Sequence, residues 1–255
     1  MPYERIAFMS SGSEEADAAR DQLAAEYGQA EFAEADCIIA LGGDGFMLEI
    51  LHTLMDRDVP VYGMNLGTVG FLMNDFGTAD LFQRLQRSKP TTIRPLVMEA
   101  TDIEGKAHSA LAINEVSLFR ASFQAAKIEV IVDDKTRLEE LICDGILLAT
   151  PTGSTAYNLS AHGPILPLAA PMLAMTPISP FRPRRWRGAI LPDHAKVSFI
   201  AHETKKRPVH AVADNIQFEN VTRVDIHQST RHKATLLYDP GHGLEERVLN
   251  EQFRF

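Results

Sequence analysis

The sequence lacks the features of a membrane protein. Its 255 residues contain no run of roughly 18 or more uncharged apolar residues, so no transmembrane helix is expected. The N-terminal stretch MPYERIAFMSS carries charge early and turns polar quickly, which is not the pattern of a signal peptide. We therefore expect a cytoplasmic protein that does not interact with membranes.

Cysteine, metal-ligand motifs and positive charge are also scarce. Cys37 and Cys143 both lie in apolar runs, which favours buried thiols over a disulfide framework. The nine histidines show no HExxH or paired-ligand spacing, so no metal site built by protein side chains is expected. The formal net charge of −9 argues against non-specific binding of nucleic acid. The one basic cluster, Arg182–Arg187, is left open as a solvated surface, a subunit contact or a phosphate-binding site.

The first part of the chain alternates short apolar runs with helical patterns. Strands are expected over 5–9, 37–41 and 59–64. Helices are expected from the capping-box spacing of Ser11 and Glu14 to about Tyr27, over 46–55, and from a cap at Thr78 to about Arg87. This alternation predicts a Rossmann-like α/β domain with a parallel sheet.

The pattern changes after Lys89-Pro90. Short β-rich runs are separated by turn residues, as at 103–105 and 133–135, and eight of the 14 prolines fall between Pro151 and Pro192. A second, all-β domain resembling a β-sandwich is therefore predicted over 93–231. A strand at 234–238 and an amphipathic helix at 243–253 are expected to return to the first domain, which would then comprise 1–92 and 232–255.

The run at 37–41 leads into Gly42-Gly43-Asp44-Gly45, directly before a helical pattern. Such a loop normally receives phosphate, because backbone N–H groups and the helix N-terminus favour anions. The loop matches neither Walker A nor the dinucleotide-binding fingerprint, which needs a glycine where Leu48 stands. Asp44 is interpreted either as a helix N-cap or as the acceptor of a substrate hydroxyl proton during phosphoryl transfer.

Three further stretches are candidates for ligand binding. The glycine-rich run from Asn65 to Phe71 follows the next parallel strand and is expected at the same sheet edge as GGDG. Asn114-Glu115 interrupts the apolar strand LAINEVSLF, so the pair must find partners, face a cavity or lie on a solvated face. The stretch from Cys143 to Ser160 ends in a loop rich in hydroxyls with a glycine and an aromatic ring, which suits a nucleotide.

These motifs together resemble the NAD kinases in order and spacing, across nearly the whole chain: LGGDG at 41–45, NLG at 65–67, GFL at 70–72, NE at 114–115, DG at 144–145 and TPTGSTAY at 150–157. GGDG also occurs in diacylglycerol kinases and phosphofructokinases, whereas its combination with TPTGSTAY and the NE pair is highly specific. The resemblance implies an N-terminal α/β domain and a C-terminal β-sandwich-like domain. It implies phosphoryl transfer from ATP to the 2′-hydroxyl of the adenosine ribose of NAD, giving NADP. It further implies Mg²⁺ with the ATP, and self-association as a dimer or tetramer.

The resemblance also assigns roles to residues. Asp44 matches the proton acceptor, and Asn114 and Glu115 match residues that hold the nicotinamide side of the ligand. The other residues expected to bind the nucleotides are Gly43, Gly45, Phe71, Asp144, Thr152, Thr155, Ala156, Tyr157, Asn158, Leu159, Ser160 and Asn215. Ala213-Asp214-Asn215 is an altered form of the Asp-Gly pair usually found near the ligand.

Two other functions stay open at this point. The chain could be a GGDG-type kinase of a lipid or sugar hydroxyl, although the TPTGSTAY loop argues against it. It could also be a non-catalytic dinucleotide sensor, although such a protein has no need of Asp44. The sequence does not distinguish ATP from other phosphate donors, or NAD from NADH.

Overall fold

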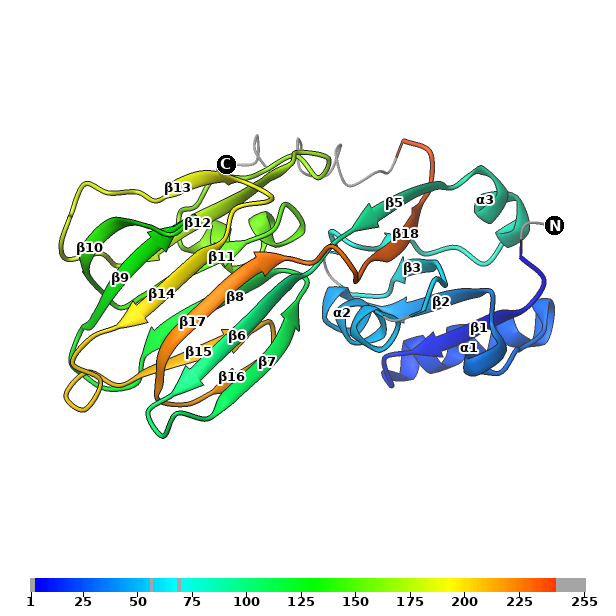
Figure 1. The fold of residues 1–255 in the computed structure, drawn as a ribbon. Coiled ribbons are helices and arrows are strands. Elements are labelled where there is room, and N and C mark those ends of the chain that lie inside the picture. The colour runs from blue at the N-terminus through cyan, green and yellow to red at the C-terminus, as the bar shows by residue number, and fades with distance from the viewer. Residues whose placement is uncertain (1–2, 56, 68–69, 242–255) are drawn as a thin grey trace. The chain divides into compact units, whose positions relative to one another are not determined.

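The computed structural model describes residues 3–55, 57–67 and 70–241 (Figure 1). The chain divides into two compact units, one formed by residues up to Ile93 and from Arg231 onward, the other by Arg94–Thr230. The helix expected at 243–253 lies outside the described residues. No helix in the described residues is long and apolar enough to cross a membrane.

The first unit is built on a sheet with the strand order β1-β2-β3-β18-β5, and β4 pairs with β3. Strands β1, β2, β3 and β18 run parallel, whereas β5 is antiparallel to β18. Figure 1 shows β18, from late in the sequence, beside β3 and β5. The elements are β1 (Ile6–Ser10), α1 (Glu14–Tyr27), β2 (Cys37–Gly42), α2 (Asp44–Thr53), β3 (Val61–Asn65), β4 (Asn74–Asp75), α3 (Leu81–Arg87), β5 (Lys89–Ile93) and β18 (Ala234–Tyr238), with a 3₁₀ turn at Phe32–Glu34.

Helices cover both faces of this sheet, which explains why every residue of β2 is buried. On one face, Leu23 of α1 and Leu85 of α3 pack in one core with Ile39 of β2. On the other face, a Cβ added to Gly63 of β3 would lie 2.3 Å from Cε of Met47 in α2. Successive side chains of a strand point to opposite faces, so α2 lies on one face of the sheet and α1 and α3 lie on the other.

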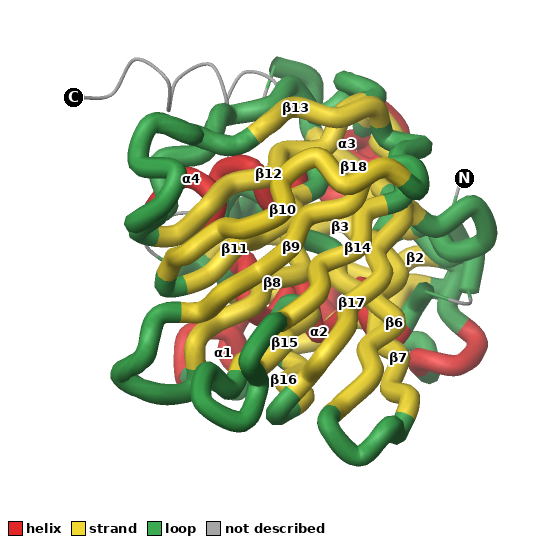
Figure 2. Tube along the Cα trace, turned by 60° about the vertical axis from the view of Figure 1, so that its left-hand side comes forward, coloured by secondary structure: helices red, strands yellow, loops and turns green. Residues whose placement is uncertain are grey.

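The second unit contains two six-stranded antiparallel sheets, ordered β10-β9-β14-β17-β6-β7 and β13-β12-β11-β8-β15-β16. Figure 2 shows strands and loops making up most of this unit. Inward residues of both sheets, such as Phe199 and Leu148, form one core, as in a sandwich. The first sheet has β6 (Leu96–Asp102), β7 (Ala107–Ala112), β9 (Ala126–Val132), β10 (Lys135–Cys143), β14 (Val197–Ala201) and β17 (Val221–Gln228). The second has β8 (Glu115–Arg120), β11 (Gly145–Ala149), β12 (Met172–Ile178), β13 (Ala189–Pro192), β15 (Val209–Ala213) and β16 (Ile216–Phe218).

The chain passes from one sheet to the other at two motif positions. The first crossing is Ile113-Asn114, between β7 and β8, and the second is Asp144, between β10 and β11. A single strand through 111–119 was expected from the sequence, and that prediction is wrong, because Asn114 lies where the strand breaks. After β11 the chain forms a 3₁₀ turn, η2 (Thr152–Thr155), and the short helix α4 (Tyr157–Ser160).

The local start and stop signals were only partly predicted. Helix α1 begins one residue after Ser13, whose hydroxyl accepts the Ala16 N–H at 3.2 Å, so the capping box expected at Ser11 is wrong. Helix α3 begins at Leu81 after Asp80, so Thr78 is not its cap. The turn predicted at 133–135 is confirmed as the β9–β10 hairpin turn. Asp133 and Asp134 both have positive φ, 52° and 59°, as a two-residue type I′ turn requires.

Both cysteines are buried and free, as expected from their apolar surroundings. Burial raises the pKa of Cys37 and of Cys143 to about 12, with nearby aspartate charge adding to the effect. The thiols are therefore protonated near neutral pH and unreactive.

The cap assignment gives a stability test. Ser13→Ala removes the side-chain acceptor at the start of α1 and should lower the free energy of unfolding by about 1 kcal/mol. Ser11→Ala is the matched control, and it should change stability by less than half as much. Urea unfolding followed by circular dichroism measures both, and an equal loss in the two variants would contradict the assigned cap.

Candidate functional site

In the first unit, the GGDG loop joins β2 directly to α2. The N-cap of α2 is Gly43, which makes no side-chain capping bond, and Asp44 is the first residue of the helix. The Asp44 carboxylate instead accepts the backbone N–H of Phe71 at 2.7 Å (Oδ2) and of Leu72 at 2.9 Å (Oδ1). The N-cap interpretation of Asp44 is therefore wrong. Its side chain connects two loops.

The second glycine-rich run lies beside the first, as the sequence predicted. Strands β2 and β3 pair in parallel up to Gly42 and Asn65, and the Leu66 N–H donates to the Gly42 carbonyl at 2.8 Å. A Cβ added to Gly70 would come within 3.1 Å of Asp44 Oδ1, so glycine lets this loop approach the carboxylate. The two loops share one edge of the sheet, the edge at which open α/β sheets bind ligands.

Gly43 and Gly45 differ from Gly70. In the described part of the chain, a Cβ added to either would meet no heavy atom within 4 Å, and neither has a positive φ. Internal packing and backbone conformation therefore do not require glycine at these two positions. Their backbone remains open to close approach by a phosphate-bearing group at the N-terminus of α2.

In the second unit, Asp214 holds the Asn114-Glu115 segment. Its carboxylate accepts three consecutive backbone N–H groups, from Ile113 (2.6 Å), Asn114 (2.9 Å) and Glu115 (3.2 Å). Asp214 sits in the β15–β16 turn with a φ of 51°, and its own N–H donates to the Glu115 carbonyl. Sequence reasoning left Asp214 out of the site. Its place beside the expected ligand residue Asn215, which is exposed, was the available signal.

The opposite side of this segment is held by the loop that follows β11. Thr150 donates its hydroxyl to the Ile113 carbonyl at 2.7 Å and its N–H to the Asn114 carbonyl at 2.9 Å. A Cβ added to Gly153 would lie 2.1 Å from the Asn114 carbonyl oxygen, so only glycine fits there. The NE and TPTGSTAY motifs are thus packed backbone against backbone.

Glu115 is not on a solvated face. Its Oε2 atom is buried and has no hydrogen-bond partner among the described residues. Burial raises the pKa of Glu115 to about 7, and the charge of Asp214 adds to this shift. A buried carboxyl oxygen without a partner is costly unless a ligand supplies a donor.

Tyr157 lies close to the same group. Its ring is tilted against Phe119 of β8, with 5.7 Å between ring centroids, and its side chain is partly exposed. Burial first, and then the negative charges of Glu115 and Asp144, raise the pKa of the Tyr157 hydroxyl. Asp144 itself accepts a hydrogen bond from Arg120 Nε at 2.6 Å. The second unit therefore gathers a carboxyl, an aromatic ring and an ion pair along β8.

Two of the expected ligand residues are buried. Thr152 is buried, and the Asn158 side chain is fully buried. The Asn158 amide donates to the carbonyls of Ser154 and Pro164 and accepts the Thr176 hydroxyl at 2.7 Å. The remaining expected residues on this segment are partly or fully exposed: Thr155, Ala156, Leu159 and Ser160.

Protein side chains alone do not assemble a metal site in the described residues, where no three His, Cys, Asp or Glu groups converge. The basic cluster is an exposed surface, where Arg182 and Arg184 lie over the Phe181 ring.

Two family models cover most of the chain. Residues 7–88 match the ATP-NAD kinase N-terminal domain, and residues 113–237 match the ATP-NAD kinase C-terminal domain. An NAD kinase of Mesorhizobium japonicum is 56% identical over 250 residues, covering 98% of this chain and 97% of that protein. An NAD kinase of Rhizobium meliloti is also 56% identical, over 251 residues and 98% of both chains.

Solved structures share the fold. Yeast NADH kinase, complexed with NADH, superposes with a TM-score of 0.86 at 21% identity, over 98% of this chain and 87% of that one. An NAD kinase from Archaeoglobus fulgidus, in complex with ATP, gives a TM-score of 0.80 at 22% identity, over 97% and 98%. The matched family models and the close, full-length relatives show that this chain belongs to the ATP-NAD kinase family.

Proposed function

We propose that this protein is an NAD kinase that transfers the terminal phosphoryl group of ATP to the 2′-hydroxyl of the adenosine ribose of NAD, giving NADP. The observation that carries the proposal is the oriented carboxylate of Asp44, held by the N–H groups of Phe71 and Leu72 within a glycine loop at a helix N-terminus. The relatives that are 56% identical are NAD kinases. Structural neighbours with this fold bind NADH and ATP.

Asp44 acts on the proton of the acceptor. The carboxylate takes the proton of the ribose 2′-hydroxyl as the hydroxyl oxygen bonds to the terminal phosphorus of ATP. The bond between that phosphorus and the bridging oxygen breaks, and ADP leaves with the electron pair. Gly43 and Gly45 let the backbone N–H groups at the start of α2 approach the phosphates.

Magnesium fits this site only as a companion of ATP. The described residues do not build a cage of three ligands, but Mg²⁺ bound to nucleotide phosphates commonly uses one or two protein carboxylates. Asp44 is the carboxylate nearest the glycine loop but is assigned to the proton, so the ion would be held mainly by the phosphates of ATP and would neutralise their charge. Self-association and a cytoplasmic location remain predictions.

The second unit supplies binding groups for the dinucleotide. Glu115 offers a buried oxygen that a ribose hydroxyl can satisfy, Asn114 an amide, and Tyr157 a partly exposed ring for stacking. Asp214 orients the first two through their backbone and is a positioning residue. A lipid or sugar kinase would not need this set, and a sensor would not need Asp44.

Asp44→Asn tests the proton acceptor. Turnover should fall by roughly 10²- to 10⁴-fold, the usual contribution of a general base, while NAD binding persists. Gly70→Ala is the matched control, because it crowds the same loop against Asp44 Oδ1 but keeps the carboxylate. Steady-state kinetics with NAD, ATP and Mg²⁺ measure both. If Asp44→Asn loses no more turnover than Gly70→Ala, the carboxylate is not the proton acceptor.

Glu115 predicts a pH dependence of NAD binding. A ribose hydroxyl donating to the carboxylate stabilises its ionised form, so binding lowers the Glu115 pKa from about 7. NAD affinity should therefore rise about tenfold from pH 6 to pH 8 and level off above. Asp214 and Tyr157 are the other ionisable groups that act on Glu115. Calorimetric titrations of wild type and Glu115→Gln decide the point: only the variant should be flat, and a flat wild-type profile would contradict the role.

Asp214 predicts a selective effect on one substrate. Asp214→Asn keeps an acceptor for Asn114 and Glu115 but can turn an amide donor toward the Ile113 N–H. KM for NAD should rise about tenfold or more, in line with a lost charge-assisted hydrogen bond, while KM for ATP stays unchanged. Gln217→Ala, an exposed neighbour in β16, is the control. Equal changes in both KM values would indicate a general loss of structure instead.

A further inference from the structure

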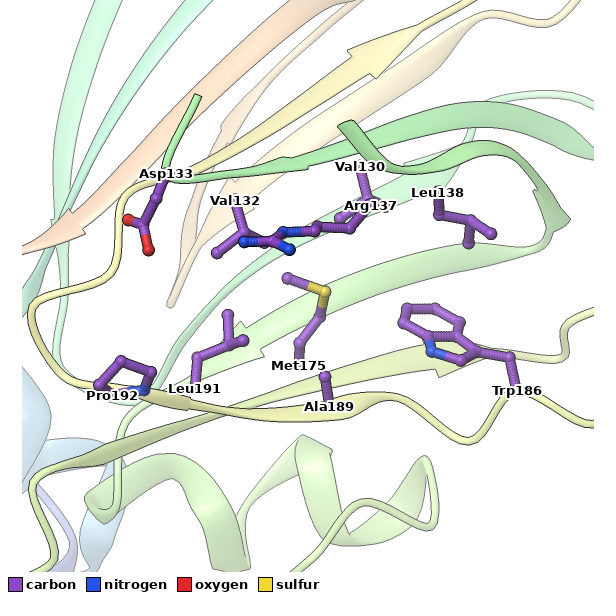
Figure 3. Close-up of a pocket in the computed structure, with 10 residues that line it drawn as sticks. All are labelled: Val130, Val132, Asp133, Arg137, Leu138, Met175, Trp186, Ala189, Leu191 and Pro192. Carbon is purple, nitrogen blue, oxygen red and sulfur yellow. The ribbon is translucent and has the colours of Figure 1, made fainter. Parts of the chain in front are cut away.

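A cavity in the second unit contains none of the residues assigned above to nucleotide binding. It has a volume of about 400 Å³ and opens between the strand pair β9–β10 of one sheet and the strand pair β12–β13 of the other (Figure 3). Its lining is Val130, Val132, Asp133, Arg137, Leu138, Met175, Trp186, Ala189, Leu191 and Pro192. The volume falls in the range of small-molecule sites, and apolar walls with few polar groups are typical of them.

A β-bulge lies at an exposed arginine of the cavity lining, Arg137. Along the β9–β10 ladder, Thr136 pairs with Ile131 and Leu138 with Val130, so the register shifts at Arg137. Bulges change the direction in which a side chain points, and Figure 3 shows the Arg137 side chain among Val132, Leu138 and Met175. In a regular strand, Arg137 and Leu138 would lie on opposite faces of the sheet.

Arg137 is the cationic side chain of the cavity lining. No carboxylate forms an ion pair with it among the described residues. Asp133 also lines the cavity, but its Oδ1 accepts the Lys196 N–H at 3.0 Å and so joins the β9–β10 turn to the residue before β14. Figure 3 shows Asp133 and Trp186 at opposite ends of the lining. The cavity therefore combines one positive group with a long apolar wall.

We propose that this cavity binds an apolar monocarboxylate of about the size of decanoate. The hydrocarbon body would lie along Leu138, Met175, Trp186 and Leu191, and the carboxylate would accept hydrogen bonds from Arg137. The proposal does not depend on the kinase activity, because the cavity residues are separate from those assigned to catalysis.

Trp186 makes the test specific, because it is the only tryptophan of the chain. Titration of decanoate, below its micellar concentration, should produce a saturable change in tryptophan fluorescence. Arg137→Gln should weaken decanoate binding by about 10- to 100-fold, as expected for one charge-assisted hydrogen bond, and should leave decanol binding unchanged. Lys135→Gln, which removes a positive charge from the same strand outside the cavity, is the matched control and should bind decanoate like wild type.

Two further variants test the site without touching Arg137. Ala189→Phe fills the cavity and should abolish both ligand signals, while Asp133→Asn removes a repelling charge and should tighten decanoate binding. Circular dichroism and NADP formation establish that each variant is folded. The proposal is overturned if decanoate gives no saturable change, or if Arg137→Gln binds it as well as wild type. If Lys135→Gln weakens decanoate binding as much as Arg137→Gln does, the attraction is non-specific, and that result would also overturn the proposal.

Discussion

Backbone N–H groups outside the strand ladders need acceptors, and in each unit an aspartate carboxylate supplies them. In the first unit Asp44 accepts two consecutive N–H groups, and in the second Asp214 accepts three. Each aspartate belongs to a different chain segment from the one that it holds. Such bonds to an ionised acceptor are stronger than neutral ones and fix the relative position of two loops.

Glu115 is the contrasting case. Nearly all buried polar atoms in proteins have a partner, yet one oxygen of this carboxyl has none in the described residues. The segment around it cannot relax, because Asp214 and Thr150 hold its backbone from two sides and Gly153 packs directly on Asn114. A rigid backbone thus keeps an unsatisfied group in place, which is the arrangement expected where a ligand completes the hydrogen bonding.

The sequence was sufficient for β1, β2, β3 and β18 and for the motifs, because the spacing of apolar residues and clusters of glycine are local signals. It was insufficient where two local signals competed. Ser11 and Ser13 can both cap a helix, and the capping-box spacing favoured the wrong one. Aspartate is a common helix cap, yet the Asp44 carboxylate accepts a hydrogen bond from Phe71, 27 residues away in sequence. The bulge at Arg137 leaves no composition signal, because it depends on pairing with β9.

The position of Asn114 shows how fold and site are connected. A residue within a ladder has both backbone groups engaged by neighbouring strands, so it has little freedom to adapt to a ligand. At the crossing between two sheets the ladder ends, and the backbone groups are free to pair with Asp214 and Thr150 instead. Asp144 occupies another such crossing, where Arg120 donates to its side chain. The sandwich topology therefore determines where binding residues can stand, and the aspartate contacts determine how they are oriented.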